Sequence, residues 1–151
     1  MRTVDRTVIA APMERVFELA AEVERWPALL SHYRYVRFLE REPAGGVVAM
    51  SAWRHFGVLP WPTWWVSEMT VHPEKYGVRY RHVRGITTGM DVEWRLSPSG
   101  TGTGVEIVHE WTGPRWPLIG KWAARQVIGP VFIHHIASRT LAGIKRHAES
   151  A

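Results

Sequence analysis

The C-terminal stretch from Trp116 to Ala148 constrains the fold of this chain most, because it is long and mostly apolar. Residues at three- and four-residue spacings within it fall on one face of a helix: Ile133, Ile136, Ala137, Thr140 and Ile144. We therefore predict one helix over 116–148 whose inner face the rest of the chain must cover. Gly129-Pro130 lies in its middle, where the proline predicts a kink.

The upstream chain is β-rich. From Arg34 the hydrophobic period changes to two and keeps that value for about 80 residues. Turn residues divide this region into candidate strands at 34–42, 46–57, 61–72, 77–84, 88–97 and 103–112. Residues 3–10 predict a further strand, and prolines suited to a first helical turn predict short helices over 13–22 and 26–32.

This order of elements predicts an α+β fold in one domain over residues 1–151. A strongly twisted antiparallel sheet of about seven strands leaves an apolar concave face. We expect the C-terminal helix to fill that concavity.

Composition narrows the class of protein. The 19 basic residues against 14 acidic ones are scattered along the chain, so we expect no nucleic-acid partner. The absence of cysteine excludes disulfides and thiolate metal sites, and neither a leader nor a long apolar run is evident. We expect a soluble, cytoplasmic protein without a metal or cofactor. Its nine tryptophans suit either a pocket for a flat apolar ligand or an ordinary core.

Three segments carry a family resemblance: VIAAPMERVFELAAEVERWPALLSHYRYVRFLER, VEIVHEW and ASRTLAGIKRHAE. Together they resemble the START-like, helix-grip (SRPBCC) superfamily, and within it the polyketide cyclase/dehydrase (aromatase/cyclase) branch. The resemblance implies a helix-grip fold: a curved sheet that holds a hydrophobic ligand against the last helix.

In that branch, pocket residues are thought to position a poly-β-ketone and move protons during aldol closure and dehydration. The resemblance matches Trp26 and Tyr33 to pocket aromatics of the family. Met69 stands where some cyclases have an arginine, and a thioether cannot donate a proton to an enolate.

His109 is the second candidate for proton transfer. The alternation in VEIVHEW places it on the same face as Val105, Ile107 and Trp111. It is either an acid or base in a dry cavity or a buried histidine satisfied by a neighbour. Thr140 is likewise either a ligand hydrogen-bond donor or a hydroxyl bonded to its own helix. The predicted ligand-binding residues are Trp26, Tyr33, Trp65, Ser67, Met69, Trp94, Ile107, His109, Ile133, Ile136 and Thr140.

Two further features have competing interpretations. Residues 56–65 concentrate Trp61, Trp64 and Trp65 beside prolines, which predicts either a tip that meets a membrane or gates the pocket, or a hairpin whose tryptophans pack inward. His134, His135 and His147 lack metal-ligand spacing and are expected to be exposed.

Three functions follow as hypotheses. The first is a binder of a small hydrophobic or aromatic ligand that resembles a polyketide, lipid or quinone. The second is an aromatase/cyclase that acts on a polyketide held by an acyl carrier protein, with Tyr33 and His109 in catalysis. The third is a quinone or lipid chaperone that works at a membrane surface. An acyl carrier protein and an anionic bilayer are both acidic, so either would match a basic surface around the cavity.

Overall fold

The computed structural model describes residues 1–56, 58–113 and 131–150. In chain order the elements are β1 (Arg2–Ile9), α1 (Met13–Ala21), the 3-10 turn η1 (Val23–Arg25), α2 (Trp26–Leu29), β2 (Tyr33–Glu42), β3 (Gly45–Phe56), β4 (Leu59–His72), the 3-10 turn η2 (Pro73–Lys75), β5 (Gly77–Gly85), β6 (Asp91–Ser99), β7 (Gly102–Glu110) and α4 (His134–Glu149).

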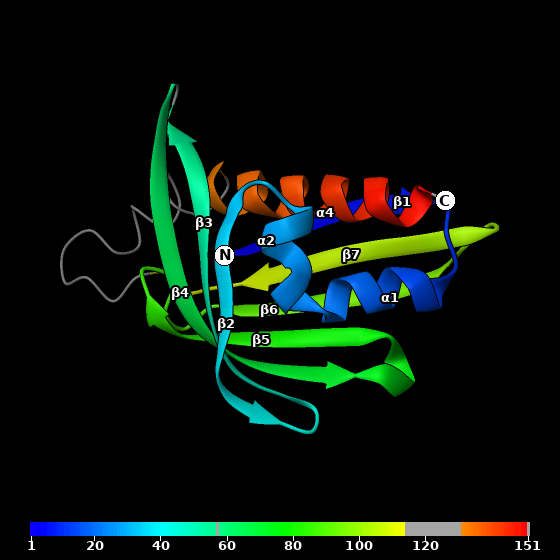
Figure 1. The fold of residues 1–151 in the computed structure, drawn as a ribbon, viewed down its shortest axis with the longest axis horizontal. Coiled ribbons are helices and arrows are strands. Elements are labelled where there is room, and N and C mark those ends of the chain that lie inside the picture. The colour runs from blue at the N-terminus through cyan, green and yellow to red at the C-terminus, as the bar shows by residue number, and fades with distance from the viewer. Residues whose placement is uncertain (57, 114–130, 151) are drawn as a thin grey trace.

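The strands form one antiparallel sheet in the order β1-β7-β6-β5-β4-β3-β2. Figure 1 shows β2, β3 and β4 standing steeply to β5, β6 and β7, so the sheet is strongly bent and α4 lies in the bend with α1 and α2. The predicted α+β helix-grip fold is therefore confirmed. The sheet is not closed, because β1 and β2 are its two free edges.

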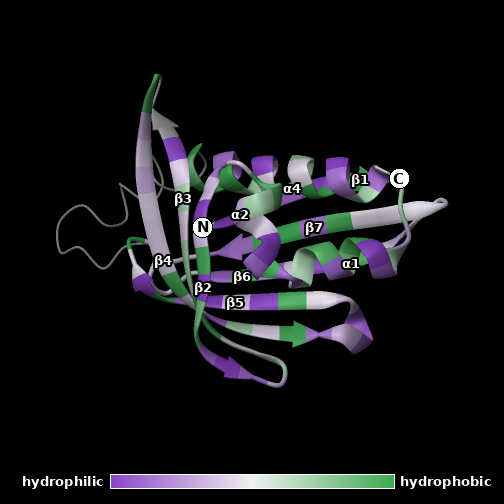
Figure 2. Cartoon of the chain, viewed as in Figure 1, coloured by the Kyte–Doolittle hydropathy of each residue, from purple (hydrophilic) through white to green (hydrophobic). Residues whose placement is uncertain are grey.

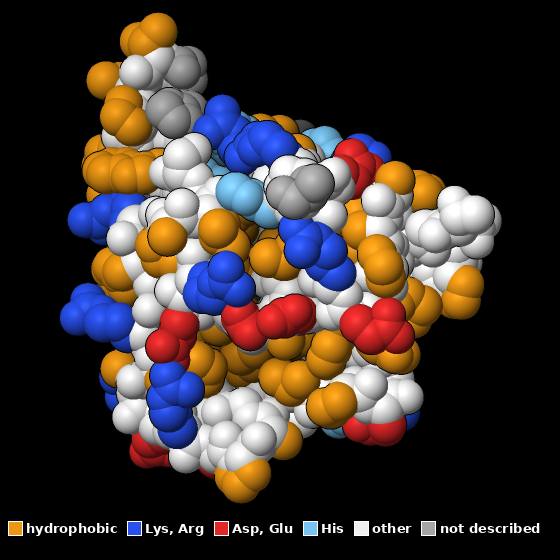
Figure 3. All heavy atoms as spheres, turned by 45° about the vertical axis from the view of Figure 1, so that its right-hand side comes forward, with side chains coloured by type: hydrophobic (Ala, Val, Ile, Leu, Met, Phe, Trp, Pro, Cys, Tyr) orange, Lys and Arg blue, Asp and Glu red, His pale blue; other side chains and the backbone are white. Residues whose placement is uncertain are grey.

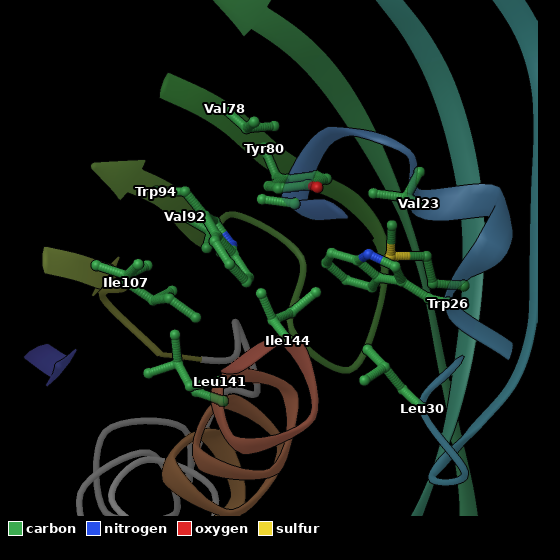
Figure 4. Close-up of a cluster of buried hydrophobic side chains, with 14 of the residues drawn as sticks. Val23, Trp26, Leu30, Val78, Tyr80, Val92, Trp94, Ile107, Leu141 and Ile144 are labelled. Atoms are coloured by element: carbon green, nitrogen blue, oxygen red, sulfur yellow. The ribbon is translucent and has the colours of Figure 1, made fainter. Parts of the chain in front are cut away.

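Alternating side chains give the sheet two different faces. Figure 2 shows polar and apolar residues interleaved along the strands. On β7, for example, Val105 and Ile107 are buried while Glu106 is only half-buried. The inward side chains meet those of the helices in one core. Figure 4 shows Trp26 of α2 and Trp94 of β6 together with Ile144 of α4 in this cluster.

Helix α4 is anchored at its C-terminal end. The Arg15 guanidinium of α1 donates hydrogen bonds to the carbonyls of His147, Ala148 and Ser150 at 2.7–2.9 Å, which supplies partners that a helix end lacks. Gly143 allows α4 to approach Leu30, the residue that follows α2, since a Cβ there would lie 2.2 Å from Cδ2 of Leu30.

The predicted elements are present, with shifted ends. The second short helix ends at Leu29 rather than at residue 32, because Leu30 is already extended (φ −122°, ψ 103°). The strand predicted from residue 88 begins at Asp91, since a turn precedes it in which the Thr88 N–H donates to the Gly85 carbonyl at 3.2 Å. Gly85 adopts a φ of 100° there.

The C-terminal helix predicted over 116–148 is described only from residue 131. A π-helical turn at 131–133 leads into α4, which ends at Glu149. Ile133, Ala137, Thr140 and Ile144 are buried along it, as predicted, and Ile136 is half-buried. The predicted kink at Gly129-Pro130 and the helical segment before it lie outside the described residues.

Candidate functional site

A pocket lies between the concave face of the sheet and the first turns of α4. It encloses about 70 Å³. Ligand pockets typically measure roughly 300–1,000 Å³, so a ligand with several rings requires the lining to move apart. The lining residues are Trp26, Tyr33, Met50, Trp65, Tyr80, His82, Thr87, Met90, Val92, Trp94, Ile107, His109, Phe132, Ile133, Ile136, Ala137 and Thr140.

Aromatic rings form one wall of this pocket. Trp26 meets Tyr33 edge-on with ring centroids 5.1 Å apart, and it meets Trp94 at 5.7 Å. The indole Nε1 of Trp26 donates to the Leu19 carbonyl at 2.9 Å, which holds the ring in place. Trp65 stacks on His82 with ring planes 6° apart. Rigid flat walls of this kind suit a planar apolar ligand better than a flexible one.

Another part of the lining carries polar groups from β5 and β7. His82 of β5 shares a 2.6 Å hydrogen bond between its Nδ1 and Oγ1 of Thr87. His109 of β7 keeps its Nδ1 buried with no hydrogen-bond partner among the described residues, and the same holds for the Tyr80 hydroxyl. Buried polar atoms without partners are costly, so these two atoms are available to a ligand.

Burial keeps the titratable groups of the pocket uncharged. Desolvation lowers the pKa of His109 to about 4 and that of His82, with a further contribution from His109, to about 3. Desolvation also raises the pKa of Tyr33 to about 12, partly offset by the Thr140 hydroxyl, and raises the pKa of Tyr80 well above its ordinary value. At neutral pH the imidazoles therefore accept or donate as neutral rings and the phenols donate. No described lining residue is Asp, Glu, Lys or Arg.

Nearly all of the residues predicted to bind a ligand line this pocket. Ser67 and Met69 do not. Both are buried on the concave face of β4, but the register pairs Ser67 with His82 and Met69 with Tyr80. These larger rings on β5 reach the pocket instead. Met69, the position of the arginine in some cyclases, is thus packed in the core.

Two open alternatives concern polar side chains. The Thr140 hydroxyl donates to the Ile136 carbonyl at 2.8 Å and lies 3.0 Å from Nε2 of His32, so it is bonded within its own helix. His109 faces the pocket without a partner for Nδ1 among the described residues.

The tryptophans of 56–65 divide between the two interpretations. Trp65 packs inward, whereas Trp61 and Trp64 remain 62% and 53% exposed. The histidines of α4 also differ: His134 is exposed and pairs with Asp5, but His147 is half-buried and its Nε2 bonds to the Leu29 carbonyl at 2.8 Å. Exposure was therefore the wrong prediction for His147, because α2 packs beside it, and also for His135, which is half-buried.

Sequence reasoning missed several lining residues. The most important are Tyr80, His82 and Thr87. A signal existed for the first two, because Val78, Tyr80 and His82 alternate inward along β5. Thr87 lies in a turn, where side chains do not alternate between two faces, so the sequence pattern could not show that Thr87 points into the pocket. Met50, Met90, Val92, Phe132 and Ala137 were also missed. Within the described residues, no group of three histidine or acidic side chains could hold a metal, and no helix is both long and apolar enough to cross a membrane.

The bent sheet, the last helix and the pocket between them are those of a helix-grip fold. The family model described as "Polyketide cyclase / dehydrase and lipid transport" matches residues 9–131. The chain belongs to that family, as the resemblance implied.

Among its relatives, a putative polyketide cyclase of Streptomyces cyaneus is 32% identical over 102 residues, which are 67% of this chain and 66% of that protein. The actinorhodin polyketide synthase bifunctional cyclase/dehydratase of Streptomyces coelicolor is 31% identical over 103 residues. That match covers 67% of this chain but only 31% of the bifunctional protein.

Solved structures share the fold at lower identity. The Zhui aromatase/cyclase from a Streptomyces species superposes with a TM-score of 0.84 at 20% identity, covering 99% of this chain and 93% of that one. A START superfamily protein from Mycobacterium smegmatis superposes with a TM-score of 0.74 at 11% identity, covering 98% and 97%.

Proposed function

We propose that the pocket binds a polyketide-derived aromatic or poly-β-carbonyl compound and promotes its aldol cyclisation and dehydration. The observation that carries the proposal is the pairing of a rigid aromatic wall with uncharged histidines and tyrosines, in a lining whose described residues include no aspartate, glutamate, lysine or arginine. Membership of the cyclase/dehydrase family supports the same chemistry. An acyl carrier protein is the proposed donor of the polyketide chain.

In the proposed reaction, Nδ1 of His109 takes a proton from a carbon that lies between two carbonyl groups. The enolate forms a carbon–carbon bond to a ketone of the same chain, and the ketone oxygen takes a proton from Tyr33 or Tyr80. Although His109 is a weak base when the pocket is empty, the enolate beside it stabilises the imidazolium. Loss of water follows when the tyrosinate takes the remaining proton of the carbon between the two carbonyl groups and the imidazolium gives its proton to the departing hydroxyl. Both side chains are then neutral again.

The aromatic wall acts on the shape of the chain. Trp26, Tyr33 and Trp94 pack against one another into a continuous wall. A narrow space beside that wall favours folded, flat conformers in which the reacting carbons are close. Met50 and Met90 have flexible side chains that can make room for such a ligand.

The test is reconstitution with a minimal polyketide synthase, followed by product analysis. We expect His109→Gln to lower the yield of the correctly cyclised product by about a hundredfold, and Tyr33→Phe to lower it less, because Tyr80 remains. The matched control is His72→Gln, a histidine outside the pocket. Identical products from wild type and His109→Gln would refute the catalytic role.

A second measurement separates catalysis from binding. Quenching of tryptophan fluorescence by 1,8-dihydroxyanthraquinone reports occupancy of the aromatic wall. We expect His109→Gln to keep most of this binding and Ile133→Trp, which fills the pocket, to abolish it. Binding that Ile133→Trp leaves unchanged would place the ligand elsewhere.

A further inference from the structure

One end of the sheet gathers exposed apolar side chains. Register brings the hairpin between β3 and β4 to the same end as the turn after β5, since Arg54 pairs with Trp61 and Trp65 pairs with Gly85. The residues before α4 lie there too, because the Arg54 guanidinium is 5.3 Å from the Phe132 ring.

The exposure at this end is large. Val58 is 93% exposed, Leu59 68% and Trp61 62%, and Trp64 is 53% exposed on the opposite face of β4. Ile86 in the neighbouring turn and Val131 before α4 add to them. Figure 1 shows that the β3–β4 hairpin projects beyond the rest of the sheet. We call residues 58–64 the hairpin tip.

The charge around the hairpin tip has one sign. No aspartate or glutamate occurs in residues 31–39 or 43–67. The same segments contain the exposed Arg34 and Arg37, and Arg84 is exposed on the adjoining strand. The Arg34 guanidinium lies 4.9 Å from the Trp53 ring and donates to Oγ of Ser51 at 3.1 Å. In Figure 3 the projecting hairpin is at upper left. Its visible side chains there include hydrophobic ones and no acidic ones.

We propose that the hairpin tip docks on an anionic membrane surface. Its residues are ordered as an interfacial anchor requires, with aliphatic side chains at the apex, tryptophans next and arginines farther back. A strand rises about 3.3 Å per residue, so Trp61 lies about 7 Å from Leu59, within the roughly 5–10 Å that an interfacial segment enters.

The shape of the hairpin tip favours a membrane over a protein partner. A stable protein interface buries about 800 Å² on each side and draws on about 20–30 residues. The end of one projecting hairpin offers far fewer residues in any one plane, whereas lipids can surround it.

Docking in this way also bears on the pocket. Thr87, Phe132 and Ile133 line the pocket at the same end of the molecule. Resting on the proposed function, this placement lets an apolar ligand pass between the bilayer and the pocket without crossing bulk water.

The test is co-sedimentation with vesicles of phosphatidylcholine, with or without phosphatidylglycerol. We expect wild type to bind the anionic vesicles and to be released by high salt. The double variant Trp61→Ser, Trp64→Ser should lose about tenfold or more in partitioning. Arg84→Gln should weaken binding only where phosphatidylglycerol is present.

The matched control is Val8→Ser, Leu39→Ser, which removes two exposed apolar side chains outside the hairpin tip and should leave binding unchanged. Circular dichroism checks that each variant is folded, and quenching by 1,8-dihydroxyanthraquinone checks the pocket separately. Equal partitioning of wild type and the tryptophan variant would overturn the proposal. So would a surface that binds no vesicle but binds a polyketide acyl carrier protein through Trp61 and Trp64.

Discussion

The two faces of the sheet carry different kinds of polar side chain. On the convex face, arginines and carboxylates of neighbouring strands pair in water: Arg6 with Glu106, Arg81 with Asp91, and Arg79 with Glu93. On the concave face, the polar side chains that line the pocket are uncharged histidine, tyrosine and threonine.

Adjacent residues of β7 show this contrast most directly. Glu106 points outward to Arg6, and Ile107 is buried at 2% exposure in the pocket lining. Water screens the outer pair, so its contribution to stability is small. The inner face is buried away from water. Removing a packed methylene or adding a proton there therefore changes the free energy of unfolding strongly. The chemistry of the pocket depends on that dryness.

Acidification should have the largest effect on stability, because it acts on the concave face. The pKa of His82 is lowered to about 3, and those of His109 and His32 to about 4, from an ordinary 6.5. Between 6.5 and these lowered values the unfolded chain binds more protons than the folded chain, so the free energy of unfolding falls as pH falls. At about pH 5 the loss is roughly 2 kcal/mol for each histidine.

Urea denaturation at about pH 7 and about pH 5 measures this loss. His109→Gln should remove its own share of the pH dependence and reduce that of His82, whose pKa His109 helps to lower, while leaving that of His32. Equal free energies of unfolding at the two pH values would contradict the dry pocket and break the contrast between the faces.

Truncation on the concave face comes next. Ile107→Ala should lower the free energy of unfolding by about 3 kcal/mol, since it removes packed methylenes and leaves a cavity. The measurement is urea denaturation at neutral pH. A loss below about 1 kcal/mol would mean that Ile107 contacts water rather than packed side chains.

Truncation one residue away should have the smallest effect. Glu106→Ala removes the partner of Arg6 on the convex face and should cost at most about 1 kcal/mol. High salt should erase the difference from wild type in the same titration. If Glu106→Ala destabilises the protein as much as Ile107→Ala does, the two faces do not differ as described.

Local patterns were sufficient for most of the fold. Alternation identified the strands, and prolines at helix starts located α1 and α2. Strand β6 starts later than predicted because Gly85 turns the chain, and a turn conformation of this kind is not visible as a hydrophobic period. The resemblance of three sequence segments to the polyketide cyclase/dehydrase branch predicted the family, and the match of the family model confirms it.

The candidate site was harder to predict, because alternation along a strand indicates which side chains point toward the core but not which of them reach the pocket. Ser67 and Met69 share the inward face of β4 with Trp65, yet only Trp65 reaches the pocket. Cross-strand pairing with His82 and Tyr80 decides this. His82 and His109 reach one lining from β5 and β7, which lie on either side of β6.

The C-terminal segment illustrates both kinds of information. Its spacing of Ile133, Ala137, Thr140 and Ile144 by itself determined that one helix face must be covered, because a helical repeat is a property of neighbouring residues. The order of elements also predicted that a twisted sheet would be the cover, and only the tertiary structure decided which polar side chains of that sheet, uncharged histidines, face the helix. The bend and register of the sheet arise from contacts between distant residues, and water exclusion follows from them.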